Sequence, residues 1–164
     1  MSLIEINPTP FEGIPQEKYP LTLFPEHLED LKKSGLNEET ILRTDLYSLN
    51  KEELEKALGY KLPKKENYTG LAFPYSKGFT RYKIFPPVVW KDGEKGVKYL
   101  QAKASGVHLY LPAGIQIQND EPIYITEGEK KALKAFQEGF SCLGLGGIWN
   151  WKTNGEDKPI KELL

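Results

Sequence analysis

The chain has 164 residues, 39% of them hydrophobic, and a formal net charge of -1. This length suits one ordinary domain or two small subdomains that share a core, and the near-neutral charge argues against a protein that coats nucleic acid over its whole surface. No stretch approaches the roughly 18 apolar residues of a membrane span, and the first residues lack a signal-peptide pattern, so we expect a cytoplasmic protein with no membrane partner. Cys142, His27 and His108 offer neither a disulfide nor a zinc-ligand spacing.

The first third of the chain predicts an extended arm followed by short helices. Residues 1–25 contain five prolines, which block helix formation. Residues 26–62 predict three short helices, at 26–34, 38–43 and 51–58. The third is the best marked, because Asn50 can cap it and Gly59 permits a left-handed end. These acidic helices are poor readers of a DNA groove, so we expect them to support a sheet or to contact a protein partner, for example a helicase.

Residues 63–118 predict a basic β-hairpin subdomain, because short aromatic and β-branched runs alternate with turn residues. The runs are GLAFPY, FTRYKIF, VVW, VKYL and VHLYLP. Strand alternation places Arg81 and Lys83 on one face, and we expect Lys98 and Lys103 to extend this basic face. Two interpretations remain open: a surface that follows the phosphates of a nucleic acid strand, or a solvated outer face.

Residues 119–164 predict a strand, a helix and a second strand. The strands are expected at 122–126 and 141–145, with the helix at 129–138. A strand, helix and strand in this order imply a parallel pair joined by a right-handed crossover. The sequence therefore predicts an α/β (α+β) fold in which a helical and β-hairpin subdomain precedes a β-α-β unit.

The richest chemistry lies between the first of these strands and the helix. Glu127 is placed at the carboxyl end of a strand, where open α/β sheets collect their ligands. Thr126 and Glu129 have the spacing of a capping box, which offers a purely structural interpretation of the acids. That interpretation leaves Lys130 and Lys131 unexplained, because the helix dipole disfavours cations in the first turn. The two lysines beside a carboxylate therefore suggest an anionic ligand or a metal-bridged phosphate.

The run ITEGEKKALKAFQEGFSCLGLGGIWNWK resembles the start of the TOPRIM-like domain in a family of phage, plasmid and mobile-element replication proteins, often fused to helicase or primase modules. The upstream words HLEDLKKSGLNEETI, GLAFPY and VKYLQAKASGVHLYLP are similar to the same family, so the resemblance covers residues 26–152. It implies a primase-like phosphotransfer function in which Glu127 acts as an acid or base or helps to place a metal. It further implies that an Asp-x-Asp pair on a later strand binds Mg²⁺, whose charge neutralises phosphate oxygens.

The sequence departs from this family at the metal site. No apolar strand that ends in Asp-x-Asp follows residue 145. We therefore expect a fragment of a primase-like protein, truncated after the first β-α-β unit. Glu127 would bind Mg²⁺ only together with carboxylates outside this chain, and the isolated chain is expected to be inactive.

Two further features carry open alternatives. The glycines of residues 144–147 could cradle a phosphate, but a tight turn after the strand is the favoured interpretation, since no P-loop lysine follows. Trp149 and Trp151 could stack bases, but packing against a further, missing element is the favoured interpretation. In the complete protein, Arg81, Lys83 and Lys98 would guide a DNA or RNA template strand. The alternatives are a non-catalytic module that binds single-stranded nucleic acid, in which Glu127 is only a capping acid, and a protein-interaction module that docks on a helicase.

Overall fold

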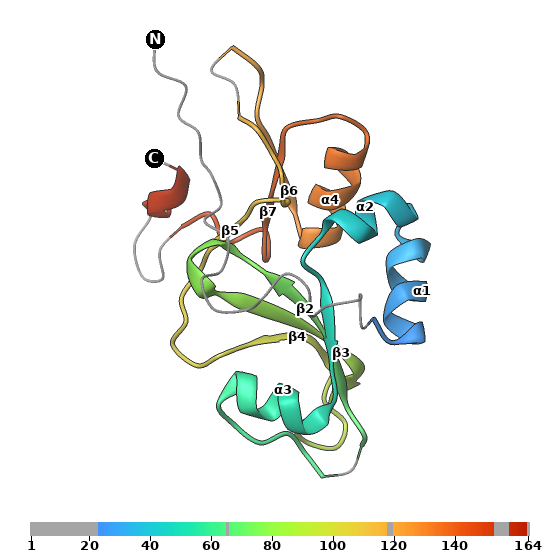
Figure 1. Cartoon of the computed structure of the whole chain (residues 1–164). Helices are drawn as coiled ribbons and strands as arrows, with labels where there is room; N and C mark the ends of the chain where they lie inside the picture. Colours follow the sequence, from blue (N-terminus) through green and yellow to red (C-terminus); the bar gives the residue numbers. More distant parts are fainter. Residues whose placement is uncertain (1–22, 65, 118–119, 153–157, 164) are drawn as a thin grey trace. The chain divides into compact units, whose positions relative to one another are not determined.

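The computed structural model describes residues 23–64, 66–117, 120–152 and 158–163 (Figure 1). The arm expected over residues 1–25 lies almost wholly outside the described residues. The described chain forms two compact units. We call residues 23–30 and 45–106 the sheet unit, and residues 31–44 and 107–163 the crossover unit. None of the helices in these ranges has the length and the apolar character that a membrane span requires.

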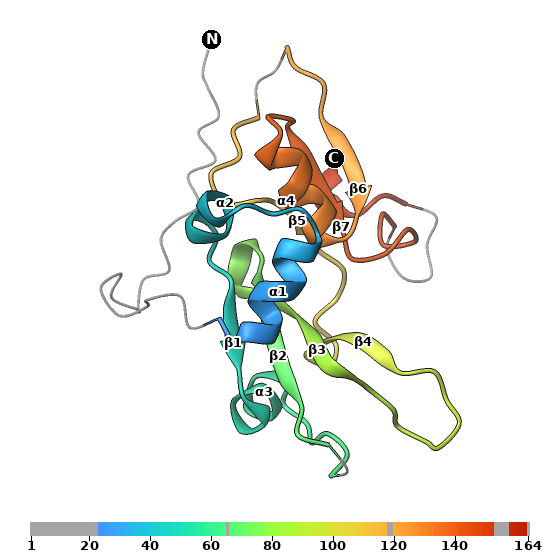
Figure 2. The same ribbon diagram turned by 90° about the vertical axis from the view of Figure 1, so that its right-hand side faces the viewer.

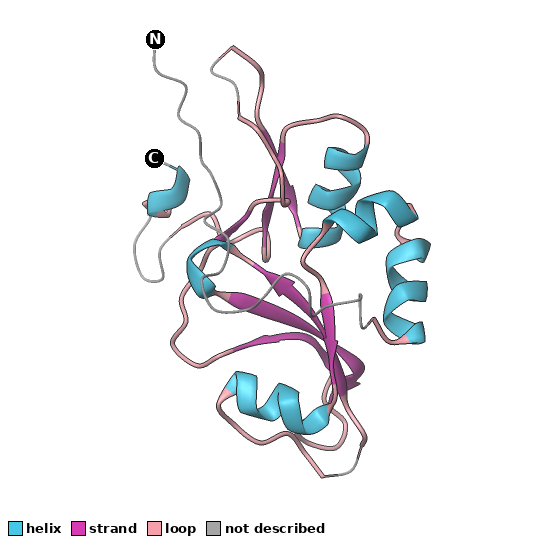
Figure 3. Ribbon diagram, in the orientation of Figure 1, coloured by secondary structure: helices cyan, strands magenta, loops and turns pink. Residues whose placement is uncertain are grey.

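The sheet unit is built on four antiparallel strands in the order β1-β2-β3-β4 (Figure 3). Their bounds are β1 Tyr47–Leu49, β2 Thr69–Pro74, β3 Thr80–Val88 and β4 Val97–Gln101, and a short 3₁₀ turn, η2 Ser76–Gly78, joins β2 to β3. The register pairs Ala72 with Tyr82 and Tyr82 with Leu100, so these side chains share one face. The hairpin formed by β3 and β4 projects beyond the rest of the sheet (Figure 2).

Helix α3, Lys51–Leu58, supplies the apolar side chains that cover this face. Its Leu54 and Leu58 are buried in one cluster with Tyr82 and Ile84 of β3. The predicted start of the helix is confirmed as a capping box. The Asn50 side chain accepts from the Glu53 N–H at 3.0 Å, and the Glu53 carboxylate accepts from the Asn50 N–H at 3.0 Å. Local sequence signals were therefore sufficient to place this helix.

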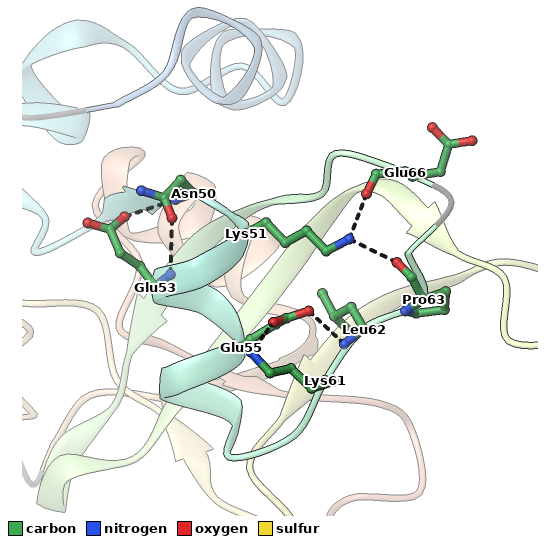
Figure 4. A network of polar contacts seen from close by, with 8 residues as sticks. All are labelled: Asn50, Lys51, Glu53, Glu55, Lys61, Leu62, Pro63 and Glu66. Carbon is green, nitrogen blue, oxygen red and sulfur yellow. Dashed lines mark hydrogen bonds and ion pairs between the residues drawn. The ribbon is translucent and has the colours of Figure 1, made fainter.

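Polar contacts tie the segment after α3 back onto the helix (Figure 4). The Glu55 carboxylate accepts from the Lys61 ammonium at 2.8 Å and from the Leu62 N–H at 3.0 Å. The Lys51 ammonium donates to the carbonyls of Pro63 and Glu66, each at 2.9 Å. The first residue and the middle of α3 thus hold the connection that leads into β2.

On the other face of the sheet lies the start of α1, Pro25–Lys33. His27 of this helix is completely buried, and its ring nitrogens approach Ser48 and Thr69 of the sheet at 2.7 and 3.0 Å. The Phe24 and Phe85 rings pack against the imidazole, with centroids 5.5 and 4.5 Å away. His27 is therefore a structural residue that fixes α1 to the sheet.

The crossover unit contains a three-stranded mixed sheet in the order β5-β7-β6. The elements are α2 Glu38–Arg43, β5 Leu109–Tyr110, β6 Tyr124–Glu127, α4 Glu129–Gln137, β7 Cys142–Leu145 and the 3₁₀ turn η3 Lys161–Leu163. Strands β6 and β7 are parallel and joined through α4, as predicted. The α+β fold class is thereby confirmed.

The pairing of β5 contradicts one expectation from the sequence. VHLYLP was assigned to the antiparallel sheet of hairpins, but its strand β5 pairs with β7 of the crossover unit. The pairing joins Leu109 to Leu145 and Tyr110 to Gly144. Composition alone predicts that a run is extended, and it does not say which partner strand supplies the hydrogen bonds. The VVW run also differs from expectation, because β3 ends at Val88 and leaves Val89 and Trp90 outside the strand.

Candidate functional site

The parallel strands β6 and β7 end side by side, and Glu127 lies at this edge. Its register partner is Leu145, the last residue of β7. The next residue, Gly128, has a φ of 90° and donates its N–H to the Leu145 carbonyl at 2.6 Å. The Glu127 side chain is 52% exposed. Because ligands of α/β sheets bind beyond the carboxyl ends of parallel strands, Glu127 occupies the position where a ligand of this unit is expected.

Two lysines follow Glu127 in the first turn of α4. The Lys131 ammonium lies 3.9 Å from the nearer Glu127 carboxylate oxygen, and the Lys131 side chain is 70% exposed. Such a long, solvated ion pair contributes little to stability. Lys130 is partly buried in the same turn. The structure therefore brings Glu127, Lys130 and Lys131 together at one edge, while their role in binding stays a prediction.

The predicted capping box at this helix is wrong. Thr126 is the third residue of β6 and pairs with Gly144, so its backbone belongs to the strand. The N-cap is Gly128, which has no side chain to accept from the helix. The local pattern failed because β6 continues to Glu127, so the helix is capped at Gly128 and not at Thr126.

Glu129 has a different setting from the one that the sequence indicated. Its side chain is only 1% exposed, in the same helix as the fully buried Ala132 and Leu133. A carboxylate in the first turn is favoured by the helix dipole, which offsets part of the cost of its burial. No sequence pattern predicted this burial, because Glu129 lies within a polar run. Glu129 is thus a second carboxylate close in sequence to Glu127, on the buried side of α4.

The glycines after α4 have separate roles. Gly144 is buried, and a Cβ there would lie 3.2 Å from the Ala132 Cβ, 3.2 Å from the Gly128 carbonyl oxygen and 3.3 Å from the Tyr110 Cβ. Only glycine lets α4 and β5 approach β7 this closely. Gly147 begins a turn, since its carbonyl accepts from the Asn150 N–H at 2.9 Å. The favoured interpretation of residues 144–147 as a tight turn is therefore correct only in part, since Gly144 and Leu145 belong to β7 and the turn begins at Gly147.

The loop after β7 exposes two aromatic rings. Trp149 is 69% exposed and Trp151 is 36% exposed. The Lys152 ammonium lies 5.9 Å from the ring of Trp149 and 5.7 Å from the ring of Trp151, within the range of a cation–π contact. Within the described residues, the rings therefore remain accessible to a ligand.

The predicted basic face of the sheet unit is largely occupied by contacts within the protein. The Lys83 ammonium donates to Asp30 at 2.5 Å, and both side chains are mostly buried. The Arg81 guanidinium lies over the Tyr99 ring at 4.8 Å. Sequence alternation placed Arg81 and Lys83 on one face, but it could not reveal that α1 brings an acid to Lys83. The structure thus gives Lys83 an acidic partner within the protein, while binding of phosphates by Arg81 and Lys83 stays a prediction.

Lys98 does not extend this face. Tyr99 pairs directly with Lys83, so those two side chains lie on the same side of the sheet, and the neighbouring Lys98 points to the opposite side. The expectation that Lys98 continues the surface of Arg81 and Lys83 is wrong. A register shift between Lys83 and Val88, which sequence alternation cannot show, lies in this hairpin.

The described residues do not build a Mg²⁺ site. Among residues 23–64, 66–117, 120–152 and 158–163, no three His, Cys, Asp or Glu side chains gather as a metal would require. Glu127 alone offers an exposed carboxylate at the strand edge, whereas Mg²⁺ takes six oxygen ligands and often more than one carboxylate. Cys142 is buried in β7 and packs in the interior of the crossover unit, and this burial raises the pKa of its thiol.

Comparison with known proteins gives one match. Residues 115–163 match the family model described as Domain of unknown function (DUF3854). This region spans β6, α4 and β7 and the loop that carries the tryptophans. No curated protein and no solved structure matches the chain. The match thus covers the candidate site and leaves the sheet unit outside it.

Proposed function

We propose that this chain is part of a primase-like replication protein of a mobile element and that its crossover unit binds the phosphates of nucleic acid. The supporting observation is the convergence of Glu127, Lys130 and Lys131 at the carboxyl edge of β6 and β7. The resemblance of the ITEGEKK word to TOPRIM-like domains supplies the class of reaction, nucleic-acid phosphotransfer. We also propose that Lys98 binds the template strand, on the side of the sheet opposite to Arg81 and Lys83.

A phosphate bound at this edge would replace the weak ion pair between Lys131 and Glu127 with a stronger contact to the lysines. Among the described residues, Lys131 forms a 3.9 Å ion pair with Glu127, and this solvent-exposed pair contributes little to stability. Lys130 stands in the same first turn, so one phosphodiester could meet both cations. Release of counterions from the nucleic acid then drives association. Binding should accordingly weaken steeply as the salt concentration rises.

Catalysis requires more carboxylates than the described residues bring together. Glu127 could contribute one oxygen ligand to Mg²⁺ in the complete protein, and further acids outside the described residues would have to complete the site. When bound, the metal would neutralise charge on the phosphate oxygens. We therefore propose Mg²⁺ as the cofactor of the complete parent protein and expect no turnover from the described residues alone.

A non-catalytic module that binds single-stranded nucleic acid is the second candidate. The exposed Trp149 and Trp151 favour it, because bases of any sequence can stack on such rings. In this case Glu127 would only pair with Lys131 and would take no part in chemistry. The two candidates share the phosphate site and differ in their response to Mg²⁺.

Tryptophan fluorescence can test the phosphate site. The chain has three tryptophans, so Trp90→Phe leaves only Trp149 and Trp151 as reporters in the loop after β7. We expect a short oligothymidylate to quench them at low salt. The Lys130→Gln/Lys131→Gln double variant should bind more weakly and should reduce the slope of log K against log salt by about 1.4, since each contact to a single strand contributes ~0.7.

A matched control removes two charges elsewhere. Lys64 and Lys161 are exposed residues of the two units, and Lys64→Gln/Lys161→Gln should leave both the quenching and the salt slope unchanged. If both double variants lower the affinity equally, the effect reflects net charge and the proposed site is wrong.

Glu127 separates the two candidates. If the site helps to hold Mg²⁺, millimolar Mg²⁺ should tighten oligonucleotide binding, and Glu127→Gln should abolish this gain. Without Mg²⁺, Glu127→Gln should tighten binding slightly, because a negative charge is removed from beside the phosphate. The control Glu52→Gln alters an exposed acid of α3. If neither Mg²⁺ nor Glu127→Gln changes the affinity for the oligonucleotide, the result supports the non-catalytic module instead.

A further inference from the structure

A second surface with aromatic and basic side chains lies in the sheet unit, along the β3–β4 hairpin. Trp90 follows β3 and is 45% exposed, and its ring centroid lies 6.3 Å from that of Tyr60, which follows α3. The Lys103 ammonium lies 5.5 Å from the Tyr60 ring. We call Tyr60, Trp90, Lys98 and Lys103 the aromatic–lysine surface. Its members are far apart in sequence, so no sequence pattern revealed it.

Hydrogen bonds hold the surface in place. The Tyr60 hydroxyl donates to the Gln101 carbonyl at 3.2 Å, and burial raises the pKa of this phenol, which keeps it protonated as a donor. The Gln101 side-chain amide donates to the Ser105 hydroxyl and to the Gly106 carbonyl at 3.0 and 2.8 Å. These bonds fix the turn that carries Lys103. The aromatic ring and the cation are thus positioned before any ligand arrives.

The strand register brings Lys98 to the same side. Lys98 and Leu100 alternate with Tyr99 along β4, so they share the face that pairs with Tyr82. Tyr60 and Leu100 both pack against the hydrophobic cluster on that face. Lys98 is exposed there. Lys98, which does not lie on the predicted basic face, therefore lies on the same side of the sheet as Tyr60.

The segment that carries the lysines of this surface is positively charged, although the whole chain is almost neutral. Residues 91–103 contain four lysines and two acids: Lys91, Lys95, Lys98 and Lys103 against Asp92 and Glu94. Val89 and Val97 are also exposed, at 39% and 37%. A partner that matches both features must offer flat apolar faces together with regularly spaced negative charges.

We propose that the aromatic–lysine surface binds single-stranded nucleic acid, with bases stacked on Trp90 and Tyr60 and phosphates held by Lys98 and Lys103. Bases supply the flat faces and the phosphodiester backbone supplies the charges. The proposal deepens the proposed function, and rests on it for the class of ligand, by naming the single strand and a site for it in the sheet unit. An acidic protein with apolar side chains would be the rival occupant.

Trp90 itself can report on this site. Replacing Trp149 and Trp151 by Phe leaves Trp90 as the only tryptophan. Titration with a short oligothymidylate should quench its fluorescence at low salt. In this background, Lys98→Gln/Lys103→Gln should weaken binding and reduce the salt slope by about 1.4, whereas Lys64→Gln/Lys161→Gln should not. Lys64 is a suitable control because it is exposed and follows Pro63, whose carbonyl accepts from Lys51, the first residue of α3.

Stacking is tested by a pair of substitutions at one position. With an end-labelled oligonucleotide as the probe, Trp90→Leu should lower the affinity about tenfold, whereas Trp90→Phe keeps a ring and should lose less. Equal losses in the two variants would exclude stacking. Thermal melts of both variants verify that the protein remains folded.

The outcomes separate this inference from the proposed function. If Trp90 is not quenched at low salt while Lys130→Gln/Lys131→Gln still weakens quenching of Trp149 and Trp151, the aromatic–lysine surface is not a nucleic-acid site. Template binding by Lys98 is then wrong as well, and the phosphate site at β6 and β7 stands. If Trp90 is quenched while the Lys130→Gln/Lys131→Gln variant binds normally, the surface is supported and the phosphate site at β6 and β7 is wrong. Trp90 quenching that is equal in double-stranded and single-stranded DNA would overturn the choice of a single strand.

Discussion

Hydrogen bonds orient the buried imidazole of His27. The Thr69 hydroxyl donates to the Glu26 carboxylate at 3.2 Å, so its oxygen can accept from His27 Nε2–H at 3.0 Å. The Ser48 hydroxyl accepts from the Phe24 N–H at 2.8 Å and lies 2.7 Å from His27 Nδ1. A neutral imidazole with its proton on Nε2 is compatible with both contacts, because the Ser48 hydroxyl can donate to Nδ1.

This arrangement predicts how stability depends on pH. Burial lowers the pKa of His27 below its usual 6.5, against the opposing charges of Glu26 and Asp30 and with a further contribution from Lys83. Below pH 6.5 the unfolded chain then binds more protons than the folded protein, so the free energy of unfolding should fall as the pH drops from 6.5 to the folded-state pKa and should level off below it. Urea unfolding at a series of pH values measures this directly.

His27→Gln is the control for that experiment, because glutamine keeps a polar side chain and does not titrate. The variant should be less stable at neutral pH and should show a smaller loss between pH 6.5 and the acid limit. Parallel curves for the two proteins would mean that other groups cause the loss, and that protonation of His27 does not oppose folding.

At the scale of elements, the contact between α4 and β7 depends on one missing side chain. Gly144 lies opposite Thr126 in the register and beneath Ala132 of α4. Two of its three nearest neighbours are backbone or short side-chain atoms, which cannot move aside as a long side chain can. The glycine thus sets the distance between the helix and the strand, and with it the position of the lysines in the first turn.

Gly144→Ala should therefore destabilise the protein by about 1–3 kcal/mol, the range typical of an overpacked core. Gly147→Ala is a matched control in the same GLGG word, because a Cβ there would lie 3.8 Å or more from its neighbours. Urea unfolding should show a lower midpoint for Gly144→Ala and nearly no change for Gly147→Ala. Equal midpoints would mean that α4 can shift away from β7 at no cost.

At the scale of the whole molecule, local signals in the sequence predicted most elements but not their neighbours. Helix α3 was correct at both ends, because Asn50 and Gly59 act within one turn of the residues that they cap. The β-α-β order was also predicted correctly. The membership of β5, the Asp30 partner of Lys83 and the side of the sheet that bears Lys98 all depend on strand pairing or on contacts between distant residues. These are set by tertiary packing, which one sequence does not display.

The same distinction applies to the candidate site. Glu127, Lys130 and Lys131 are adjacent in sequence, so a single motif predicted that they meet at the strand edge. The aromatic–lysine surface joins the end of α3 to a hairpin and a later turn, and only the pairing of the strands brings these segments together. Continuous sites can be predicted from a motif, whereas discontinuous sites require the fold.

Two binding surfaces in separate compact units lead to a prediction about stoichiometry. The phosphate site lies in the crossover unit and the aromatic–lysine surface in the sheet unit. With oligonucleotides of about six nucleotides, close to the smallest site sizes of single-strand binders, we expect the protein to bind about two equivalents at low salt. Each double lysine variant should bind about one, and the variant that combines Lys98→Gln, Lys103→Gln, Lys130→Gln and Lys131→Gln should bind almost none. Calorimetric titration counts these equivalents. A single equivalent that either double variant abolishes would instead mean that both surfaces contact the same short strand.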